Sequence, residues 1–95
     1  MTPHTLSGPL QRFPGPTGWY YLPLPEALDP LFRPLVQARW PALVGVRCTV
    51  GATTWDGSIM PIRGGPLFLA FPARVRSRES LEVGTEVTVS FVLRS

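Results

Sequence analysis

Residues 18–25 read GWYYLPLP, and the stretch 47 positions later, residues 65–72, reads GPLFLAFP. Each copy opens on a glycine, continues through a short apolar or aromatic run and stops at a proline. Six pairs of positions share this spacing: Phe13/Met60, Pro14/Pro61, Gly18/Gly65, Leu22/Leu69, Pro25/Pro72 and Leu28/Val75. A fixed internal spacing is typical of a structural unit that occurs twice. We therefore predict two similar halves, about residues 10–50 and 53–94, that share one core.

The composition is that of a folded domain. The chain has 95 residues, of which 44% are hydrophobic and 16% charged, and its net charge is +3. This length suits a single domain, residues 1–95, with one core. No apolar run reaches the roughly 18 residues of a membrane helix, and the pattern of a secretory signal is absent, so we expect a cytoplasmic protein. All nine basic residues are Arg, which we interpret as the codon bias of a bacterial genome rich in G and C.

The first half is punctuated by proline. Nine of the twelve prolines fall in the first 41 residues, which keeps helices short and places strands at edges. The pattern predicts strands over residues 6–13 and 19–22, with residues 1–9 left as a mobile stretch.

A short helix is predicted after the second of these strands. Asp29 before Pro30 has the pattern of an N-cap followed by proline at the first helical position. One helical face then carries Leu31, Leu35 and Ala38. Pro34 is expected to strain or divide this helix, and Trp40-Pro41 to close the segment.

The second half has clearer periodicity. Val46, Cys48 and Val50 alternate with smaller or polar residues, which predicts a half-buried strand. Further strands are predicted over residues 53–60, 67–71 and 86–93, and a short helix with Val75 facing inward over residues 73–80. Residues 67–71 are apolar on both faces, so we expect a central strand there.

These elements predict a mainly β fold with short helices. Two strand-helix-strand halves that interleave their strands form a small closed barrel, which removes most exposed strand edges. Because one chain supplies both halves, we expect a monomer.

Four motifs occur in order along the chain: residues 18–25, TTWDGSIMP at 53–61, LFLAF at 67–71 with ARVR at 73–76, and VGTEVTV at 83–89. With these motifs, roughly residues 10–94 resemble a bacterial family of small domains of unknown function. Members of that family also occur beside or fused to bacteriocin-protection proteins of the YdeI and OmpD-associated type.

The resemblance implies a double-split β-barrel, the architecture shared at fold level with AbrB-like and MazE-like DNA-binding proteins. It implies no established activity. This chain has Pro72 where the family usually has Lys, and Gly84-Thr85 where the family usually has Gly-Asp. The first departure removes a basic side chain, and the second alters a turn.

Several kinds of catalytic site are disfavoured. His4 is the only histidine, and with a single cysteine the chain cannot assemble a histidine triad or a typical zinc site. Cys48 alternates with two valines, so we interpret it as a core residue rather than a nucleophile. Gly64-Gly65 precedes a strand rather than a helix, so it is not a phosphate-binding loop. We expect no cofactor and no bound metal.

Two groups of residues are candidates for a binding site. Arg63, Arg74, Arg76 and Arg78 form a cluster of cations around the second predicted helix and the preceding strand. Asp56 is the only acid within an otherwise uncharged predicted strand, and Trp55 precedes it. Each group has a plain structural interpretation, a solvated helix face for the arginines and a turn or bulge residue for Asp56.

Three functional hypotheses follow. The preferred one is a non-catalytic binding or interaction module whose anionic partner, a nucleic acid or an acidic protein, contacts the four arginines. The second is a small-molecule-binding or enzymatic domain that uses Asp56 and Trp55 and therefore needs a pocket beside them. The third, an AbrB-like DNA-binding protein, rests on the fold analogy alone.

Overall fold

The computed structural model describes residues 3–16, 18–38 and 43–94. Over these residues the chain forms a seven-stranded sheet and two short helices. The elements are β1 (His4–Pro9), β2 (Gln11–Arg12), β3 (Tyr20–Pro23), α1 (Asp29–Gln37), β4 (Val44–Val50), β5 (Thr53–Pro61), β6 (Leu67–Phe71), α2 (Ala73–Glu79) and β7 (Glu86–Leu93). The mainly β class and the strands predicted for the second half are confirmed.

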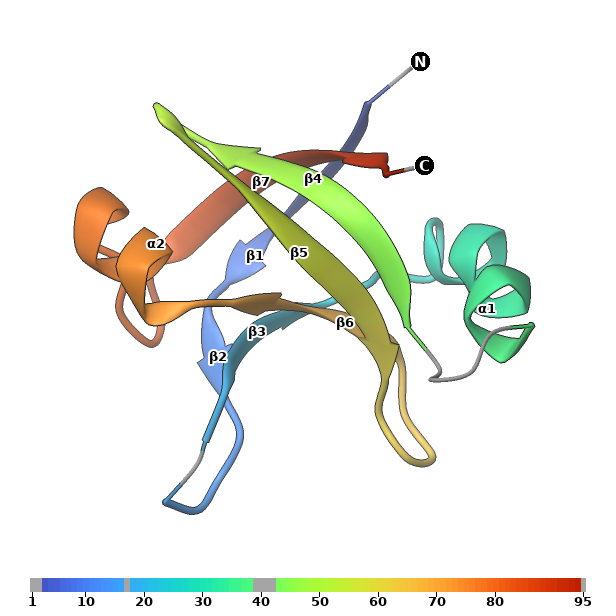
Figure 1. The fold of residues 1–95 in the computed structure, drawn as a ribbon. Helices are drawn as coiled ribbons and strands as arrows, with labels where there is room; N and C mark the ends of the chain where they lie inside the picture. The colour runs from blue at the N-terminus through green and yellow to red at the C-terminus, as the bar shows by residue number, and fades with distance from the viewer. Residues whose placement is uncertain (1–2, 17, 39–42, 95) are drawn as a thin grey trace.

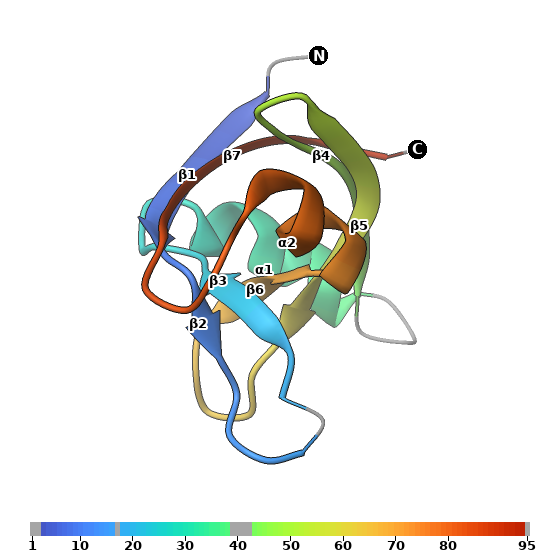
Figure 2. The same cartoon turned by 90° about the vertical axis from the view of Figure 1, so that its left-hand side faces the viewer.

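The sheet curls into a nearly closed barrel with the strand order β1-β7-β4-β5-β6-β3-β2 (Figures 1 and 2). All neighbouring strands are antiparallel. The two ends of this order, β1 and β2, are separated in the chain by Leu10 alone. The N-terminal segment therefore pairs first with β7 and then crosses to β3. Leu10 stays bound to the turn before β7, since its N–H donates to the Thr85 carbonyl and its own carbonyl accepts the Gly84 N–H, both at 2.9 Å.

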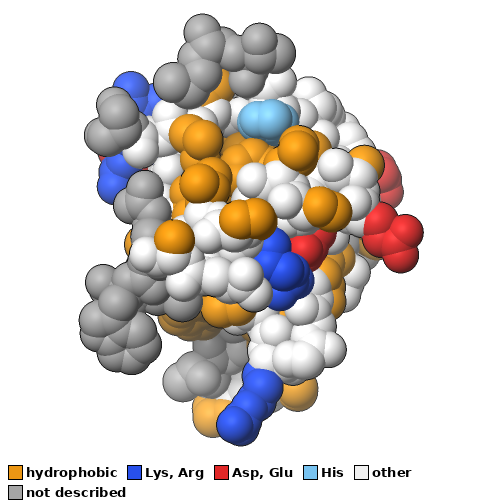
Figure 3. Space-filling model, turned by 90° about the vertical axis from the view of Figure 1, so that its right-hand side faces the viewer, with side chains coloured by type: hydrophobic (Ala, Val, Ile, Leu, Met, Phe, Trp, Pro, Cys, Tyr) orange, Lys and Arg blue, Asp and Glu red, His pale blue; other side chains and the backbone are white. Residues whose placement is uncertain are grey.

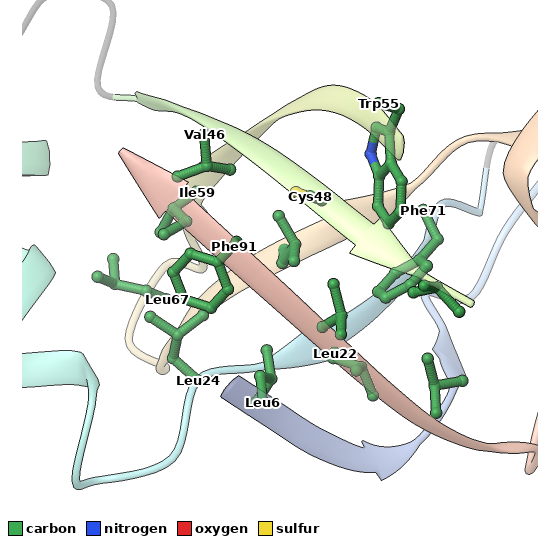
Figure 4. Packing of buried hydrophobic residues seen from close by; sticks show 14 of the residues in the cluster. Leu6, Leu22, Leu24, Val46, Cys48, Trp55, Ile59, Leu67, Phe71 and Phe91 are labelled. Carbon is green, nitrogen blue, oxygen red and sulfur yellow. The ribbon is translucent and has the colours of Figure 1, made fainter. Parts of the chain in front are cut away.

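Alternating side chains from the strands fill the barrel (Figure 4). In β4 every second residue is buried, as the period of two predicts, and in β7 Val87, Val89 and Phe91 are buried while Leu93 is partly buried. Cys48 is a free, buried thiol, which confirms its assignment to the core. Residues 67–69 of β6 are all buried, which confirms that β6 is a central strand. Each large apolar side chain buried in this way contributes about 1.5–3 kcal/mol, so the core is the main source of stability.

The two helices lie at opposite ends of the barrel, with α2 facing the viewer in Figure 2. α1 buries Phe32 and Val36 rather than the face that carries Leu31 and Leu35, which are 57% and 37% exposed. Figure 3 shows the side of the molecule that carries α1, where apolar side chains gather at the surface. α2 turns Val75 into the core, as predicted.

The predicted N-cap of α1 is wrong. The N-cap is Leu28, and Asp29 is already in the first helical turn and makes no capping hydrogen bond. Asp29 is instead held by Arg33 within the helix and by the Leu67 N–H. Pro34 does not divide the helix, because α1 runs through it to Gln37. The predicted end at Trp40-Pro41 lies outside the described residues.

The N-terminal segment contains a strand. Residues 4–9, which fell in the predicted mobile stretch, form β1 and pair with β7 from His4 opposite Phe91 to Pro9 opposite Glu86. The His4 ring packs against Phe32 and Phe91, with ring centroids 5.0 and 5.5 Å apart. The predicted strand over residues 6–13 is divided between β1 and β2.

The repeated segments have matching local hydrogen bonds. The Pro25 carbonyl accepts the N–H groups three and four positions later, from Leu28 and Asp29, and the Pro72 carbonyl does the same with Val75 and Arg76. The Gly18 N–H donates three positions back to Gly15, as the Gly65 N–H does to Ile62. In the sheet, Leu22 of β3 lies directly opposite Leu69 of β6.

Candidate functional site

A groove of about 550 Å³ opens where β5 and β6 separate, and α2 and the start of β3 form its other walls. Its lining includes Trp19, Tyr20, Asp56, Ser58, Arg74 and Arg76. β5 pairs with β6 only from Ile59 to Pro61, whereas it pairs with β4 from Thr53 to Ile59. Residues 55–58 of β5 therefore have no strand neighbour on the β6 side, and the groove opens beside them.

The sequence after β6 places two arginines at this opening. Pro72 ends β6 in an extended conformation, with φ −68° and ψ 158°, and α2 begins at the next residue. Val75 anchors α2 in the core and is fully buried. Arg74 and Arg76 flank Val75 in the sequence, and both line the groove.

Arg76 is held against an aromatic ring. Its guanidinium carbon lies 3.7 Å from the centroid of the Tyr20 ring, and its Nε donates to the Phe71 carbonyl at 3.2 Å. Arg12 approaches the same ring at 5.9 Å. Such cation–π contacts keep a guanidinium in place without neutralising its charge. Within the described residues, no carboxylate pairs with Arg74 or Arg76.

Trp19 gives the groove an aromatic wall that is open to solvent. Its side chain is 53% exposed, and its ring leans on Phe68 with the centroids 6.5 Å apart. Phe68 also packs with Phe13 and Tyr21 on the outer face of the barrel, where Phe13 and Tyr21 stack at 4.0 Å. This outer aromatic cluster supports the indole from one side and leaves part of it accessible.

Asp56 lies in β5 directly opposite Arg47 of β4, not in a turn. One carboxylate oxygen accepts the Arg47 Nε at 3.1 Å, and the other pairs with Arg94 at 3.0 Å. The hydrogen bonds from Arg47 and Arg94 lower the pKa of Asp56 below its ordinary value. Asp56 therefore remains ionised at neutral pH, where it accepts hydrogen bonds but is a poor proton donor.

Trp55 does not offer a stacking surface, because its side chain is only 3% exposed. The indole packs against Phe71 at 5.4 Å inside the barrel (Figure 4). Its Nε1 is the buried side-chain donor without a partner in the described residues. Gly57 makes room for it, since a Cβ at that position would lie 3.0 Å from Nε1.

The structure brings together four of the six residues that the sequence singled out. Arg74, Arg76 and Asp56 line the groove, as does the small exposed part of Trp55. Arg63 lies in the turn that precedes β6, at the other end of that strand from α2 (Figure 1). Arg78 is exposed on α2 but does not line the groove.

Sequence reasoning missed Tyr20 and Ser58 as lining residues. The signal for Tyr20 was present, because residues 19–21 form a run of three aromatic residues directly after a glycine. Ser58 carries no signal of its own. It lies beside the groove only because β5 leaves β6 at this point.

The structure gives no support for thiol chemistry. Burial raises the pKa of Cys48 to about 12, so the thiol stays protonated. The described part of the chain holds no group of three His, Cys, Asp or Glu side chains arranged for a metal ion. Neither described helix has the length and apolar character needed to cross a membrane.

Fold and groove together define a small, nearly closed β-barrel with a cationic and aromatic opening between two of its strands. Residues 7–91 match the family model described as a domain of unknown function, DUF1905, and the chain belongs to that family. A comparison with curated proteins gives no match.

Proposed function

We propose that this protein is a non-catalytic binding module that holds a small anionic ligand in the groove between β5, β6 and α2. The observation that carries the proposal is Arg76, which is fixed over Tyr20 at 3.7 Å and has no carboxylate partner in the described residues. Arg74 adds a second cation to the same groove. Guanidinium groups are well suited to carboxylate or phosphate oxygens.

The size of the groove favours a small molecule over a macromolecular surface. Ligand pockets typically measure about 300–1,000 Å³, and this groove measures about 550 Å³. Duplex DNA is read by a helix or ribbon that enters a groove of the nucleic acid. α2 has seven residues, and Arg76 is folded back onto the barrel. These features favour the small ligand over the AbrB-like alternative.

We infer that the barrel has an approximate two-fold axis. This axis would exchange β3 with β6, β7 with β4, and the β1–β2 segment with β5. The strand order is consistent with this exchange, because β5 lies between β4 and β6 just as β1 and β2 lie between β7 and β3. The double-split architecture that the sequence resemblance implies is consistent with this arrangement.

The strand registers fit the same axis. Leu6 opposite Val89 corresponds to Trp55 opposite Cys48. Gln11 opposite Tyr21 corresponds in the same way to Met60 opposite Phe68. Both comparisons relate the β1–β2 segment to β5 by one shift of 49 positions, which superposes Gly8 on Gly57.

The axis relates the cationic groove to a second groove of about 510 Å³, which is lined by Leu24, Asp29, Arg33 and Gly65 among others. In this second groove Asp29 corresponds to Arg76, which lies 47 positions later in the sequence. In the second groove Asp29 and Arg33 are paired with each other, because Arg33 donates to Asp29 at 2.6 and 2.8 Å and the Leu67 N–H donates at 3.0 Å, and the acid Glu26 also lines this groove. The cation of the second groove is thus bound to an acid, whereas Arg74 and Arg76 in the first groove have no carboxylate partner in the described residues.

The enzymatic alternative is weaker. It needs Asp56 as an acid or base, and the hydrogen bonds from Arg47 and Arg94 lower the pKa of Asp56, which makes it a poor proton donor and a weak base at neutral pH. A neighbouring or fused bacteriocin-protection protein, which the sequence resemblance implies, is compatible with a ligand-binding role but is not required for it.

The test is a titration with inorganic pyrophosphate, followed by backbone and indole N–H chemical shifts. In the unaltered protein we expect the shifts of Trp19, Tyr20 and Arg76 to move and saturate, and the effect to weaken at higher salt. Arg74→Gln combined with Arg76→Gln should abolish these shifts. Arg78→Gln is the matched control, because it removes a cation from the same helix outside the groove. Equal responses in all three proteins would contradict the proposal.

A further inference from the structure

The geometry points to a nucleotide as the ligand of this groove, with its base stacked on Trp19 and its phosphate at Arg74 and Arg76. This inference rests on the proposed function and adds the chemical class of the ligand. It covers a free mononucleotide and the end of a single strand, since both present the same base and phosphate.

The groove has an aromatic wall that is open to solvent. A simple anion would contact the arginines but would not explain the exposed Trp19. The Trp19 side chain is 53% exposed, and its ring lies 6.5 Å from the ring of Phe68, measured between centroids. A supported indole with an accessible face is what a planar ring requires for stacking. Base stacking on aromatic side chains is tolerant of sequence and contributes substantially to binding of single strands.

The lining of the groove carries mixed charge. Asp56 lines the same groove as Arg74 and Arg76, stays ionised and is paired with Arg47 and Arg94. An anion without donor groups can bind the two guanidinium groups but leaves the acceptors of Asp56 and Ser58 unused. A nucleotide carries phosphate oxygens for the guanidinium groups together with hydroxyl and N–H donors that Asp56 and Ser58 can accept.

Two cations approach one ring beside Trp19. Arg76 and Arg12 approach Tyr20 at 3.7 and 5.9 Å, and Tyr20 directly follows Trp19. Tyr20 therefore connects the anion-binding Arg76 of α2 with the stacking surface of Trp19, and both residues line the same groove. A ligand that joins a planar ring to an anionic group can contact both.

The experiment is calorimetric titration with AMP, with ribose 5-phosphate, which lacks the base, and with adenosine, which lacks the phosphate. We expect AMP to bind at least tenfold more tightly than either fragment. Trp19→Ala should reduce AMP affinity by roughly tenfold, the usual effect of losing one stacking partner, and leave ribose 5-phosphate unchanged. Trp19→Phe should restore most of the loss.

Leu31→Ala is the matched control, because Leu31 is an equally exposed apolar side chain on α1, away from the groove. Thermal unfolding of each variant shows whether it is folded. A tetranucleotide arm separates the two sources: tighter binding than AMP identifies a single strand, and equal or weaker binding identifies the free nucleotide.

Equal affinity for AMP and ribose 5-phosphate would overturn the nucleotide inference while leaving the anion site intact. Binding of neither compound, with no response to pyrophosphate, would overturn the proposed function itself. Loss of AMP binding in Trp19→Ala that Trp19→Phe does not restore would also contradict a stacking role.

Discussion

The Asp29 carboxylate accepts hydrogen bonds from two Arg33 nitrogens and from the Leu67 N–H. The bond from Arg33 is the main reason that the pKa of Asp29 lies below its ordinary value. A lowered pKa means that folding favours the ionised carboxylate. Its contribution to stability is therefore present above the unfolded-state pKa, near 4, and is lost as the pH falls through the lower folded-state value.

Asp29→Asn should flatten the acid limb of the stability curve below about pH 4 and lower the free energy of unfolding at neutral pH by roughly 1–3 kcal/mol. Urea unfolding at several pH values measures both effects. Glu26→Gln is the matched control, because Glu26 is a nearby exposed acid. An acid limb as steep in Asp29→Asn as in the unaltered protein would refute the assignment.

For single residues, burial that follows from the periodicity of a strand or helix was predictable from the sequence. A contact with a partner distant in the sequence was not. Cys48 and Val75 are buried where their strand and helix patterns indicate. Asp29 looked like an N-cap because nothing in the sequence reveals that Leu67 lies beside it. The two tryptophans at positions 19 and 55 are chemically identical, and only the fold makes one open and the other buried.

The helix α1 contains a proline at an interior position. Pro34 has no N–H to donate back to Pro30, and its ring crowds the preceding turn. The helix persists because Phe32 and Val36 on either side of Pro34 are anchored in the core. Tertiary packing outweighs local propensity here, which explains why the predicted division did not occur.

Pro34→Ala should stabilise the protein by roughly 1–2 kcal/mol. An interior proline costs about 3 kcal/mol relative to alanine, and the greater entropy of the unfolded alanine variant offsets part of that gain. Denaturant unfolding is the measurement, and Pro30→Ala is the control, since proline in the first turn is tolerated. A lower unfolding midpoint for Pro34→Ala would show that the proline ring makes a stabilising contact.

The whole barrel depends on the segment that crosses from β7 to β3. The sequence predicted a closed barrel and a repeat. It did not reveal that one bent segment pairs with β7 through β1 and with β3 through β2. The bend lies at Leu10, whose side chain is 1% exposed. Pairing of β1 with β7 is non-local, and no short-range pattern encodes it.

Deletion of residues 1–9 should leave β7 with an unpaired edge and open the core. We expect a lower unfolding temperature and concentration-dependent self-association, because exposed strand edges pair with other chains. Analytical ultracentrifugation against the full chain, which we expect to be a monomer, is the measurement. Deletion of residues 1–3 is the control, since it leaves β1 in place. A monomeric, equally stable deletion of residues 1–9 would show that β1 is dispensable.

The pairing of β1 with β7 also has a consequence for synthesis. Of the described strands, β1 leaves the ribosome first, and its partner β7 leaves last. Until β7 has been synthesised, Leu6 and its apolar neighbours, which are buried in the folded protein, remain exposed. The loop-closure entropy of joining distant segments makes such a step slow. The pairing of β1 with β7 is thus a late step in folding. Before it forms, the exposed apolar surface makes the chain more prone to bind chaperones and to misassemble.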